Sequence, residues 1–276
     1  MIRRRPLVMA VLNATPDSFS DGGKWFRARD AVRRAREMTA AGADLVDIGG
    51  ESTRPGAAPV SLAEELRRVV PVIERLASSV RIPISVDTSK AEVAARAIAA
   101  GASIVNDVTA LHGDPQMASM VADSRAAVIL MHMRGSPDTM QRSPRYRDVA
   151  SEVERFLLDA TATAQRSGIE RSRILIDPGL GFGKTVTHNL QLMHALPRLA
   201  SLGFPVVIGP SRKSFIGRVL NAEISDRLYG TLACVAQAFY GGAHLVRVHD
   251  VKPAADLLRM LEAIEKAGND AVGRQH

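Results

Sequence analysis

Short apolar segments alternate with longer amphipathic segments along almost the whole chain. The apolar segments contain many β-branched residues, as strands buried on both faces do. They cover residues 7–12, 44–48, 82–86, 103–105, 126–131, 174–176, 205–208 and 245–248. Apolar positions spaced by three and four residues predict helices over 28–41, 61–78, 90–100, 115–123, 147–167, 189–201, 225–240 and 253–267. The pattern therefore consists of eight consecutive strand–helix units.

Eight regular strand–helix units predict an α/β protein with a closed (β/α)8 TIM barrel. An open, doubly wound sheet of the Rossmann kind is the alternative that the pattern alone leaves open. The 276 residues are close to the length of about 250 that is common for a single-domain barrel. No linker or change of composition divides the chain. We therefore expect one domain over residues 1–276, with a flexible tail from about residue 268.

Residues typical of helix ends support these boundaries. Ser61 precedes Glu64 by three residues, which is the spacing of a capping box at a helix start. Glycine readily takes the left-handed conformation that often ends a helix. It stands at or just after the end of four predicted helices, as Gly42, Gly101, Gly168 and Gly203.

Composition and charge limit the partners and the cellular location that we expect for this protein. The net charge is +7, but the basic residues are scattered rather than gathered in a stripe with aromatic residues, so we expect no nucleic-acid partner. The apolar run after Arg3, Arg4 and Arg5 is too short for a signal peptide, and no segment reaches the roughly 20 apolar residues of a membrane span. The single cysteine, Cys234, has no partner for a disulfide. We expect a cytoplasmic protein that does not bind membranes.

Polar residues follow every predicted strand, where the active sites of barrel enzymes are built. In chain order they are Asn13, then Glu51 with Thr53 and Arg54, Asp87, Asn106, His132, Asp177, Arg212 with Lys213, and Arg247 with His249. Solvation of loops explains any single one of them equally well. It does not readily explain eight in succession, so the set predicts a site.

One part of this set suits a flat heterocycle. Asp87, Asn106 and Asp177 offer hydrogen-bond acceptors and an amide to a ring edge rich in N–H groups, and Lys213 could donate to a ring carbonyl. An aminopyrimidinone has these features. Metal ligation by the two aspartates is the alternative, but their neighbours lack the His or Cys spacing of a zinc site.

Another part suits an anion. Arg54, Arg247 and His249 would present fixed donors to phosphate oxygens if a barrel brings their strand ends together. Surface salt bridges are the alternative for the arginines. The segment 13–23, NATPDSFSDGG, is expected to be a mobile loop that closes over a ligand. Within 209–217, GPSRKSFIG, a short helix beginning at Ser214 would suit a carboxylate or phosphate. The segment 177–185, DPGLGFGKT, lacks the Walker spacing of nucleotide-binding loops.

Taken together, the motifs resemble those of the dihydropteroate synthases, a family of pterin-binding enzymes. They occur in family order over nearly the whole chain as LNATPDSFSDGG, GGESTRPG, SVDTSK, NDV, MHM, DPGLGFGKT followed by His188, Asn189 and Leu190, GPSRKSFIG and RVHDV. The resemblance implies condensation of a dihydropterin diphosphate with p-aminobenzoate, release of pyrophosphate, competition by sulfonamides, and a homodimer.

The resemblance also implies roles for individual residues. A pterin would be held by Asp87, Asn106, Asp177 and Lys213. The diphosphate would be held by Asn13, Arg54, Arg247 and His249, with Asn13 also near Mg²⁺. The p-aminobenzoate would be bound by Thr53, Arg54, Pro55, Phe182, Lys213 and Ser214. Catalysis would depend on Asn13, Arg54, Lys213, Arg247 and His249.

Other readings remain open at this point. A pterin-dependent methyltransferase domain would share the barrel and the ring pocket, but it would not need the residues for diphosphate and p-aminobenzoate. A catalytically silent paralogue, which binds pterin or serves only as an assembly subunit, is disfavoured because every motif is intact. A Schiff-base aldolase using Lys213 is disfavoured, because polar neighbours such as Arg212 do not indicate a desolvated lysine. The implied reaction needs no enzyme nucleophile, so we expect Ser211, Ser214 and Cys234 to position or pack.

Overall fold

The computed structural model describes residues 5–14, 24–52, 58–137 and 139–272. Its strands are β1 (Leu7–Asn13), β2 (Leu45–Gly49), β3 (Ile84–Asp87), β4 (Ile104–Asp107), β5 (Ala127–Met131), β6 (Ile174–Asp177), β7 (Val207–Ile208) and β8 (Leu245–Val248). Its α-helices are α1 (Lys24–Ala40), α2 (Leu62–Ala77), α3 (Ala91–Ala99), α4 (Met117–Asp123), α5 (Val149–Arg166), α6 (Val186–His194), α7 (Leu196–Ala200), α8 (Ser214–Leu220), α9 (Leu228–Tyr240) and α10 (Val251–Val272). Short 3-10 helices cover Arg171–Arg173 and Ile224–Asp226.

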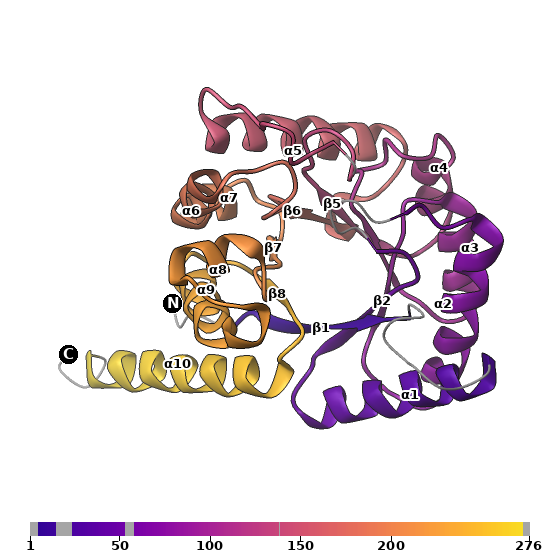
Figure 1. The fold of residues 1–276 in the computed structure, drawn as a ribbon, viewed down its shortest axis with the longest axis horizontal. Helices are drawn as coiled ribbons and strands as arrows, with labels where there is room; N and C mark the ends of the chain where they lie inside the picture. The colour runs from indigo at the N-terminus through magenta and orange to yellow at the C-terminus, as the bar shows by residue number, and fades with distance from the viewer. Residues whose placement is uncertain (1–4, 15–23, 53–57, 138, 273–276) are drawn as a thin grey trace.

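The eight strands form one parallel sheet that curves into a barrel with the helices outside it (Figure 1). The hydrogen-bonded order is β6-β5-β4-β3-β2-β1-β8-β7, so strands adjacent in sequence are adjacent in space and the first strand pairs with the last. The ring is completed between β6 and β7 by a single bridge from Ile176 to Val206. This topology confirms the predicted TIM barrel, because a doubly wound sheet leaves two open edges and reverses its strand order.

Several helix boundaries differ from the predictions by a few residues, and the differences with a clear physical reason lie at α6–α7 and at α10. The helix expected over 189–201 is two helices, α6 and α7, which meet at Ala195. Pro197 cannot donate a backbone hydrogen bond, so it fits the first turn of a new helix better than the middle of a long one. The last helix continues through Gly268 to Val272. A single interior glycine costs only about 1 kcal/mol relative to alanine, which does not suffice to end a helix.

The predicted helix ends are largely confirmed. All four glycines have positive φ, and at Gly101, with φ of +116°, an added Cβ would lie 2.5 Å from the Cβ of Ala77. Ser61 caps α2 by accepting a hydrogen bond from the Glu64 backbone N–H. The Glu64 carboxylate instead accepts from two arginines of its own helix, so this capping box is only half formed. A complete capping box starts α6, between Thr185 and His188.

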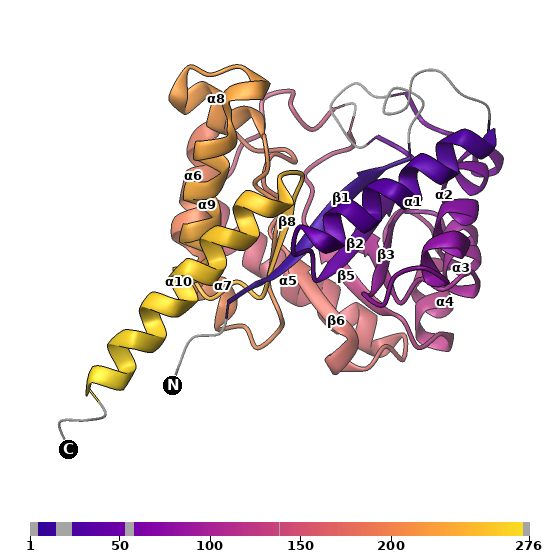
Figure 2. The same ribbon diagram turned by 90° about the horizontal axis from the view of Figure 1, so that it is seen from below.

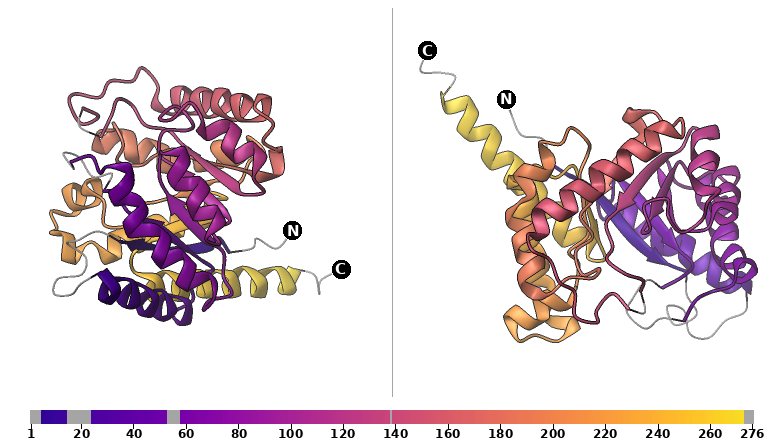
Figure 3. Two further views of the ribbon diagram at one scale, coloured as in Figure 1. Left: turned by 90° about the vertical axis from the view of Figure 1, so that its right-hand side faces the viewer. Right: turned by 90° about the horizontal axis from the view of Figure 1, so that it is seen from above.

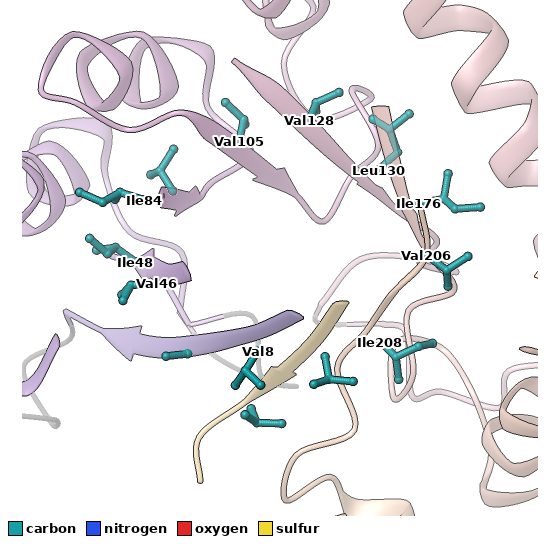
Figure 4. Close-up of a cluster of buried hydrophobic side chains, with 14 of the residues drawn as sticks. Val8, Val46, Ile48, Ile84, Val105, Val128, Leu130, Ile176, Val206 and Ile208 are labelled. Carbon is teal, nitrogen blue, oxygen red and sulfur yellow. The ribbon is translucent and has the colours of Figure 1, made fainter. Parts of the chain in front are cut away.

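Side chains alternate between the two faces of each strand, which separates two apolar layers. Outward-facing residues such as Val46, Ile48 and Leu130 pack between the sheet and the helices, as Figure 4 shows for ten labelled side chains. Inward-facing residues form a second, smaller cluster inside the barrel. That inner cluster consists of Met9, Leu45, Ile129, Val207 and Leu245, with Ile104 and Leu175 beside it.

The last helix, α10, packs against α9 and β1 and then extends beyond the barrel (Figure 2). Both views of Figure 3 show the same extension beside the ring of helices. None of the helices in the described parts of the chain is long and apolar enough to cross a membrane.

Candidate active site

The inner face of the barrel changes from apolar to polar toward the C-terminal ends of the strands. Because side chains alternate, the residue two positions after an inward-facing apolar residue also faces inward. On β2 this places Asp47 after Leu45, and on β8 it places Arg247 after Leu245. These two strand ends therefore direct polar residues into the interior of the barrel, as the sequence pattern predicted.

Four neighbouring strands form a row of small and polar residues at this end. Asn13 of β1 is in register with Gly49 of β2, Gly49 with Asp87 of β3, and Asp87 with Asn106 of β4. Gly49 carries no side chain, and an added Cβ there would lie 3.6 Å from the Cβ of Asp87. Gly49 lies between Asn13 and Asp87 in the sheet, so β2 places no side chain between these two residues.

Arg247 lies at the centre of the polar groups. Its Nε donates to Oδ2 of Asp47 at 2.6 Å, and its Nη2 donates to Oδ2 of Asp87 at 2.8 Å. The amide of Asn106 donates to the same Oδ2 of Asp47 at 3.1 Å. The structure thus joins Arg247, which was predicted for the diphosphate, to Asp87 and Asn106, which were predicted for the pterin.

These ion pairs strongly affect proton affinity. Burial raises the pKa of Asp87 to about 7; the nearby carboxylates of Asp47, Glu65 and Asp107 add to the rise, and Arg247 opposes it. Burial by itself lowers the pKa of Arg247, but Asp47 and Asp87 outweigh burial and raise it. Arg247 therefore remains charged while Asp87 titrates near neutral pH.

Asp177 and Lys213 come from β6 and from the segment after β7, the strand that pairs with β8, and an added Cβ at Gly209 would lie 3.8 Å from both Arg247 Cβ and Lys213 Nζ. Asp177 ends β6, and its Oδ1 accepts from the backbone N–H of Gly179 at 2.7 Å. Burial raises the pKa of Asp177, while Lys213 acts against that rise. The Lys213 ammonium donates to the backbone oxygen of Leu180 and lies 4.9 Å from the ring centre of Phe182. Phe182 and Lys213 are thus brought together as predicted.

The environment of Lys213 differs from the prediction. Its neighbours in sequence are polar, but in the fold burial lowers its pKa to about 8, against an attractive contribution from Asp177. Arg212, the polar neighbour that argued against desolvation, turns away and pairs with Asp250, with Nε 2.9 Å from Oδ2. Lys213 is therefore less solvated than its sequence neighbours predicted, because the fold separates adjacent side chains.

The glycine-rich segment after β6 is held in place by its backbone. Gly179 has φ of +68°, and an added Cβ would lie 1.9 Å from the backbone oxygen of His132, so only glycine fits there. The Gly181 N–H donates to Oδ1 of Asn189 at 2.7 Å, and the Tyr146 hydroxyl donates to the Gly183 oxygen at 2.9 Å. The segment therefore presents Phe182 on a fixed support.

Lys184 is part of this support. Its side chain is buried, and its Nζ lies 2.9 Å from both the Phe182 oxygen and Nδ1 of His132. Burial lowers the pKa of Lys184 well below its usual value, and burial together with Lys184 lowers that of His132 to about 3. Lys184 points to these neighbours and not to a phosphate site, in agreement with the missing Walker spacing.

His249 and Ser214 lie near the ends of β8 and β7. The backbone N–H of His249 donates to Oγ of Ser211 at 3.1 Å, and Nδ1 of its ring lies 3.0 Å from the same oxygen. Ser211 is thus a positioning residue for His249, as expected of a serine that is not a nucleophile. Ser214 is the exposed first residue of α8, which confirms the helix start predicted there.

A cavity of about 190 Å³ opens beside Asp87, and acidic residues line part of it. Lys90 pairs with Glu51 and, at 2.6 Å, with the fully buried Glu65. The second Glu51 oxygen accepts from the Val60 N–H at 3.3 Å. Glu51 was predicted as a site residue. Its bond to Val60 links the chain before residues 53–57 to the chain after them.

Some predicted residues lie outside the described part of the chain. These are Thr53, Arg54 and Pro55, together with residues 15–23 of the predicted mobile loop. Their assigned roles stay predictions.

Two important residues were missed by the sequence reasoning. Asp47 was counted only as part of a strand, although a charged residue inside an apolar strand is itself a signal of a buried ion pair. Lys184 was counted only as part of a loop, and its sequence neighbours give no sign of its burial.

Comparisons with known proteins agree with this geometry. The sequence profile described as "Pterin binding enzyme" matches residues 9–249. The dihydropteroate synthase of Escherichia coli K12 is 48% identical over 258 residues, which cover 94% of this chain and 91% of that protein.

Solved structures give the same result. A dihydropteroate synthase of Xanthomonas albilineans with 4-aminobenzoic acid matches with a TM-score of 0.89 and 49% identity, over 95% of this chain and 93% of that chain. Another from the same organism, in complex with 7,8-dihydropteroate, matches with a TM-score of 0.87 and 45% identity, over 96% of this chain and 95% of that chain. The chain therefore belongs to the pterin-binding enzyme family and, within it, to the dihydropteroate synthases.

Proposed function

We propose that the protein condenses a (7,8-dihydropterin-6-yl)methyl diphosphate with p-aminobenzoate, giving 7,8-dihydropteroate and pyrophosphate. The observation that carries this proposal is that Arg247 is joined to Asp87 directly and to Asn106 through Asp47, with Asp177 and Lys213 near enough to interact with its charge. A ring pocket and an anion-binding guanidinium thus share one enclosed space. A substrate that combines an N–H-rich ring with a diphosphate fits both.

The ring is assigned to the buried acceptors. Asp87 and Asp177 accept from ring N–H groups, the amide of Asn106 pairs with a ring edge, and Lys213 donates to the ring carbonyl. A buried site that pairs each polar group of its ligand rejects analogues that lack them, because the protein groups would be left without partners.

The diphosphate is assigned to Arg247, His249, Asn13 and Arg54. Arg247 and His249 lie on β8 and just after it, and Asn13 ends the adjacent strand β1. Positive charge fixed in an enclosed site stabilises the negative charge that develops on pyrophosphate as it leaves.

We assign Mg²⁺ to the Asn13 end of this site. Within the described residues, no group of three His, Cys, Asp or Glu side chains could hold a metal ion. The Asn13 amide oxygen is a hard ligand of the kind that suits Mg²⁺, which often takes few protein oxygens and binds substrate phosphates instead. When bound, Mg²⁺ supplies further charge neutralisation to the leaving group. Asn13 would contribute its amide oxygen, and Arg247 would act on the diphosphate directly.

The chemistry follows from the two substrates. The bond between the exocyclic methylene carbon and the diphosphate oxygen breaks, and its electron pair leaves with pyrophosphate. The dihydropterin ring delocalises the positive charge that remains on the methylene carbon. The amine nitrogen of p-aminobenzoate then forms the C–N bond, and its proton passes to pyrophosphate or to water. The protein provides charge stabilisation and exclusion of water, and it needs no covalent intermediate.

The p-aminobenzoate site is assigned to Phe182, Lys213 and Ser214, together with Thr53, Arg54 and Pro55. The Phe182 ring supplies an apolar surface beside the Lys213 ammonium, and Ser214 supplies a hydroxyl for the carboxylate. Sulfonamides have the shape of this aromatic amine, so we expect them to compete with it.

We also propose that the protein forms a homodimer through α6, α8 and α9. These helices contact each other on one side of the molecule (Figure 1). They and the short 3-10 helix between them expose large apolar side chains, namely Leu190, Val219, Leu220, Ile224 and Tyr229. Exposed apolar clusters of this kind mark association surfaces. Light scattering should give twice the mass of the chain, and Tyr229→Glu should shift the mass toward that of one chain.

Domain organisation and location complete the proposal. A single domain over residues 1–276 should unfold in one cooperative transition, which calorimetry tests. A cytoplasmic location is supported by Cys234, the single cysteine of the chain, which has no partner for a disulfide within it and so suits a reducing compartment.

The test of the activity is direct. The purified protein is incubated with dihydropterin diphosphate, p-aminobenzoate and Mg²⁺, and both products are measured, with Asp177→Ala and Arg247→Ala as controls. Mg²⁺-dependent formation of dihydropteroate that is lost in both variants supports the proposal. Tight pterin binding without product would instead identify a silent paralogue or a methyltransferase domain.

A further inference from the structure

We propose that Asp47 is a positioning residue that fixes Arg247 and Asn106 relative to each other, and thereby sets the distance between the diphosphate and pterin subsites. The inference rests on the proposed function, because it takes Arg247 as a diphosphate ligand and Asn106 as a pterin ligand. Asp47 itself is assigned no contact with substrate.

The position of Asp47 places it behind the residues that face the ligand. It lies two residues after Leu45 of the inner apolar cluster and two residues before Gly49 of the polar row. It is fully buried. Its register partners are Val11 on β1 and Ser85 on β3, so it is surrounded by the barrel wall. Asp47 therefore supports the residues that face the ligand and does not itself line the mouth of the barrel.

The contacts of Asp47 are concentrated on one oxygen. Oδ2 accepts from Nε of Arg247 at 2.6 Å and from Nδ2 of Asn106 at 3.1 Å. These donors come from β8 and β4, on opposite sides of β2. A single acceptor shared by both makes the position of one donor depend on that of the other. Neither Asp47 Oδ1 nor the neighbouring Ser85 Oγ has a hydrogen-bond partner among the described residues.

A negative charge is needed at this position, because Asp87 cannot hold Arg247 alone. Asp87 is itself assigned to the pterin, and burial raises its pKa to about 7. Asp47 keeps one fixed contact to the guanidinium when Asp87 binds ligand or takes up a proton. A buried carboxylate contributes little net stability, since desolvation offsets the attraction. Its value here is geometric, because misplacement of a reacting group by about 1 Å can cost roughly a hundredfold in rate.

The experiment compares Asp47→Asn with Ser85→Ala. The first keeps the size of the side chain and removes its charge, while the second removes, from the adjacent register position, a buried oxygen that has no hydrogen-bond partner among the described residues. Circular dichroism and thermal unfolding establish that each variant is folded; Asp47→Ser is the alternative if the amide is not accommodated. Calorimetry then measures binding of two probes, inorganic pyrophosphate and 6-hydroxymethylpterin.

We expect Asp47→Asn to weaken both probes by roughly tenfold and to lower kcat by roughly a hundredfold. The KM for p-aminobenzoate should change by less than about threefold, because that subsite, at Phe182 and Lys213, is separated from Asp47. Ser85→Ala should leave both affinities and kcat near the wild-type values.

Double-mutant cycles test the coupling itself. Asp47→Asn combined with Arg247→Gln should weaken pyrophosphate binding little more than Arg247→Gln alone, since the role of Asp47 in that subsite acts through Arg247. The combination with Asn106→Ala should show the same for the pterin probe. Additive losses in either cycle would overturn the proposal.

A pH profile gives a readout that simple loosening of the fold would not produce. Arg247, Asp47, Glu65 and Asp107 are the charged groups that act on Asp87. Removing the charge of Asp47 takes away one repulsion, so the acid limb of kcat/KM should move to lower pH in Asp47→Asn and stay in place in Ser85→Ala.

The outcomes separate the two claims. If folded Asp47→Asn binds both probes as the wild type does, or if Ser85→Ala shows the same losses, the proposal is wrong. If the wild type makes no dihydropteroate but Asp47→Asn still weakens both probes in a coupled way, the proposed activity fails and the positioning role stands.

Discussion

Two layers of side chains fill the barrel, and the same strands supply both of them two residues apart. The pairs are Leu45 and Asp47, Ile104 and Asn106, Leu175 and Asp177, and Leu245 and Arg247. The first member of each pair belongs to the apolar inner cluster or packs against it, and the second lies among the polar groups of the candidate site. On each of these strands, the apolar residue that stabilises the fold and the polar residue of the candidate site are therefore only two positions apart.

The two layers obey different energetics. Each buried apolar side chain contributes about 1.5–3 kcal/mol by leaving water. A buried ion pair contributes little on balance, because the loss of hydration offsets its attraction, yet breaking it leaves an uncompensated charge. The apolar layer should therefore tolerate changes that preserve volume, whereas the polar layer should tolerate almost none. The following predictions test that difference, beginning with the largest effect.

Arg247→Ala should be the most damaging single change. It leaves the buried carboxylates of Asp47 and Asp87 without their cation, which should lower the free energy of unfolding by about 3–5 kcal/mol. Pyrophosphate binding should be lost in the molecules that fold. Urea unfolding and calorimetry measure the two effects. A variant with wild-type stability would show that the two carboxylates take up protons at little cost.

Leu245→Ala is the matched change in the apolar layer of the same strand. It should lower the free energy of unfolding by about 2–5 kcal/mol, because it leaves a cavity between buried neighbours. Both KM values should stay near wild type below the unfolding transition. If KM for the pterin substrate rose in Leu245→Ala by as much as pterin affinity falls in Asp47→Asn, the two layers would not differ in their role.

Lys184→Met should weaken the support of Phe182. The change leaves the Phe182 oxygen and Nδ1 of His132 without their buried donor, at a cost of about 1–3 kcal/mol in stability. The KM for p-aminobenzoate should rise while pyrophosphate affinity is unchanged. Steady-state kinetics with each substrate varied in turn distinguish this from a general loss of fold, which would affect both.

Near neutral pH, a smaller effect is a pH dependence set by Asp87 and Lys213. Their pKa values of about 7 and about 8 predict that kcat/KM for the pterin substrate is greatest between these values, because the carboxylate and the ammonium are then both charged. Below about pH 7 the rate should fall roughly tenfold per pH unit. Asp87→Asn should abolish this acid limb in the remaining activity.

Stability should respond to Asp87 in the opposite direction. Its pKa rises from 3.8 to about 7 on folding, so between these pH values the folded state binds more protons than the unfolded state. The contribution of Asp87 to the free energy of unfolding should then decrease as the pH rises from about 4 to about 7. Urea unfolding of the wild type and Asp87→Asn at both ends of this range measures the difference. An increase with pH would mean that Arg247 dominates and lowers the pKa of Asp87.

Much of the fold follows from local pattern. All eight predicted strands are confirmed, because each is a short apolar run whose neighbours along the chain clearly differ from it. The break at Ala195 and the long α10 were not predicted, since one proline or one glycine can be accommodated in more than one way.

The site was predicted in part. The site residues at the strand ends were predicted because polar residues follow each predicted strand. The closed barrel brings these strand ends together. Asp47 was missed because a strand residue gives no indication of its partner 200 positions away in the chain. The partial burial of Lys213, which lowers its pKa to about 8, was missed because exposure depends on residues that are distant in sequence.

The sequence by itself determined the eight strand–helix units, the helix ends at positive-φ glycines, and the supply of carboxylates, amides and cations at the strand ends. These depend on interactions between residues a few positions apart. Only the tertiary structure decided that Asp47 and Asp87 share Arg247, that Arg212 leaves the site for Asp250, and that Lys184 supports Phe182. The reason is that ring closure sets the distances between strands, and burial then determines which charges must find a partner.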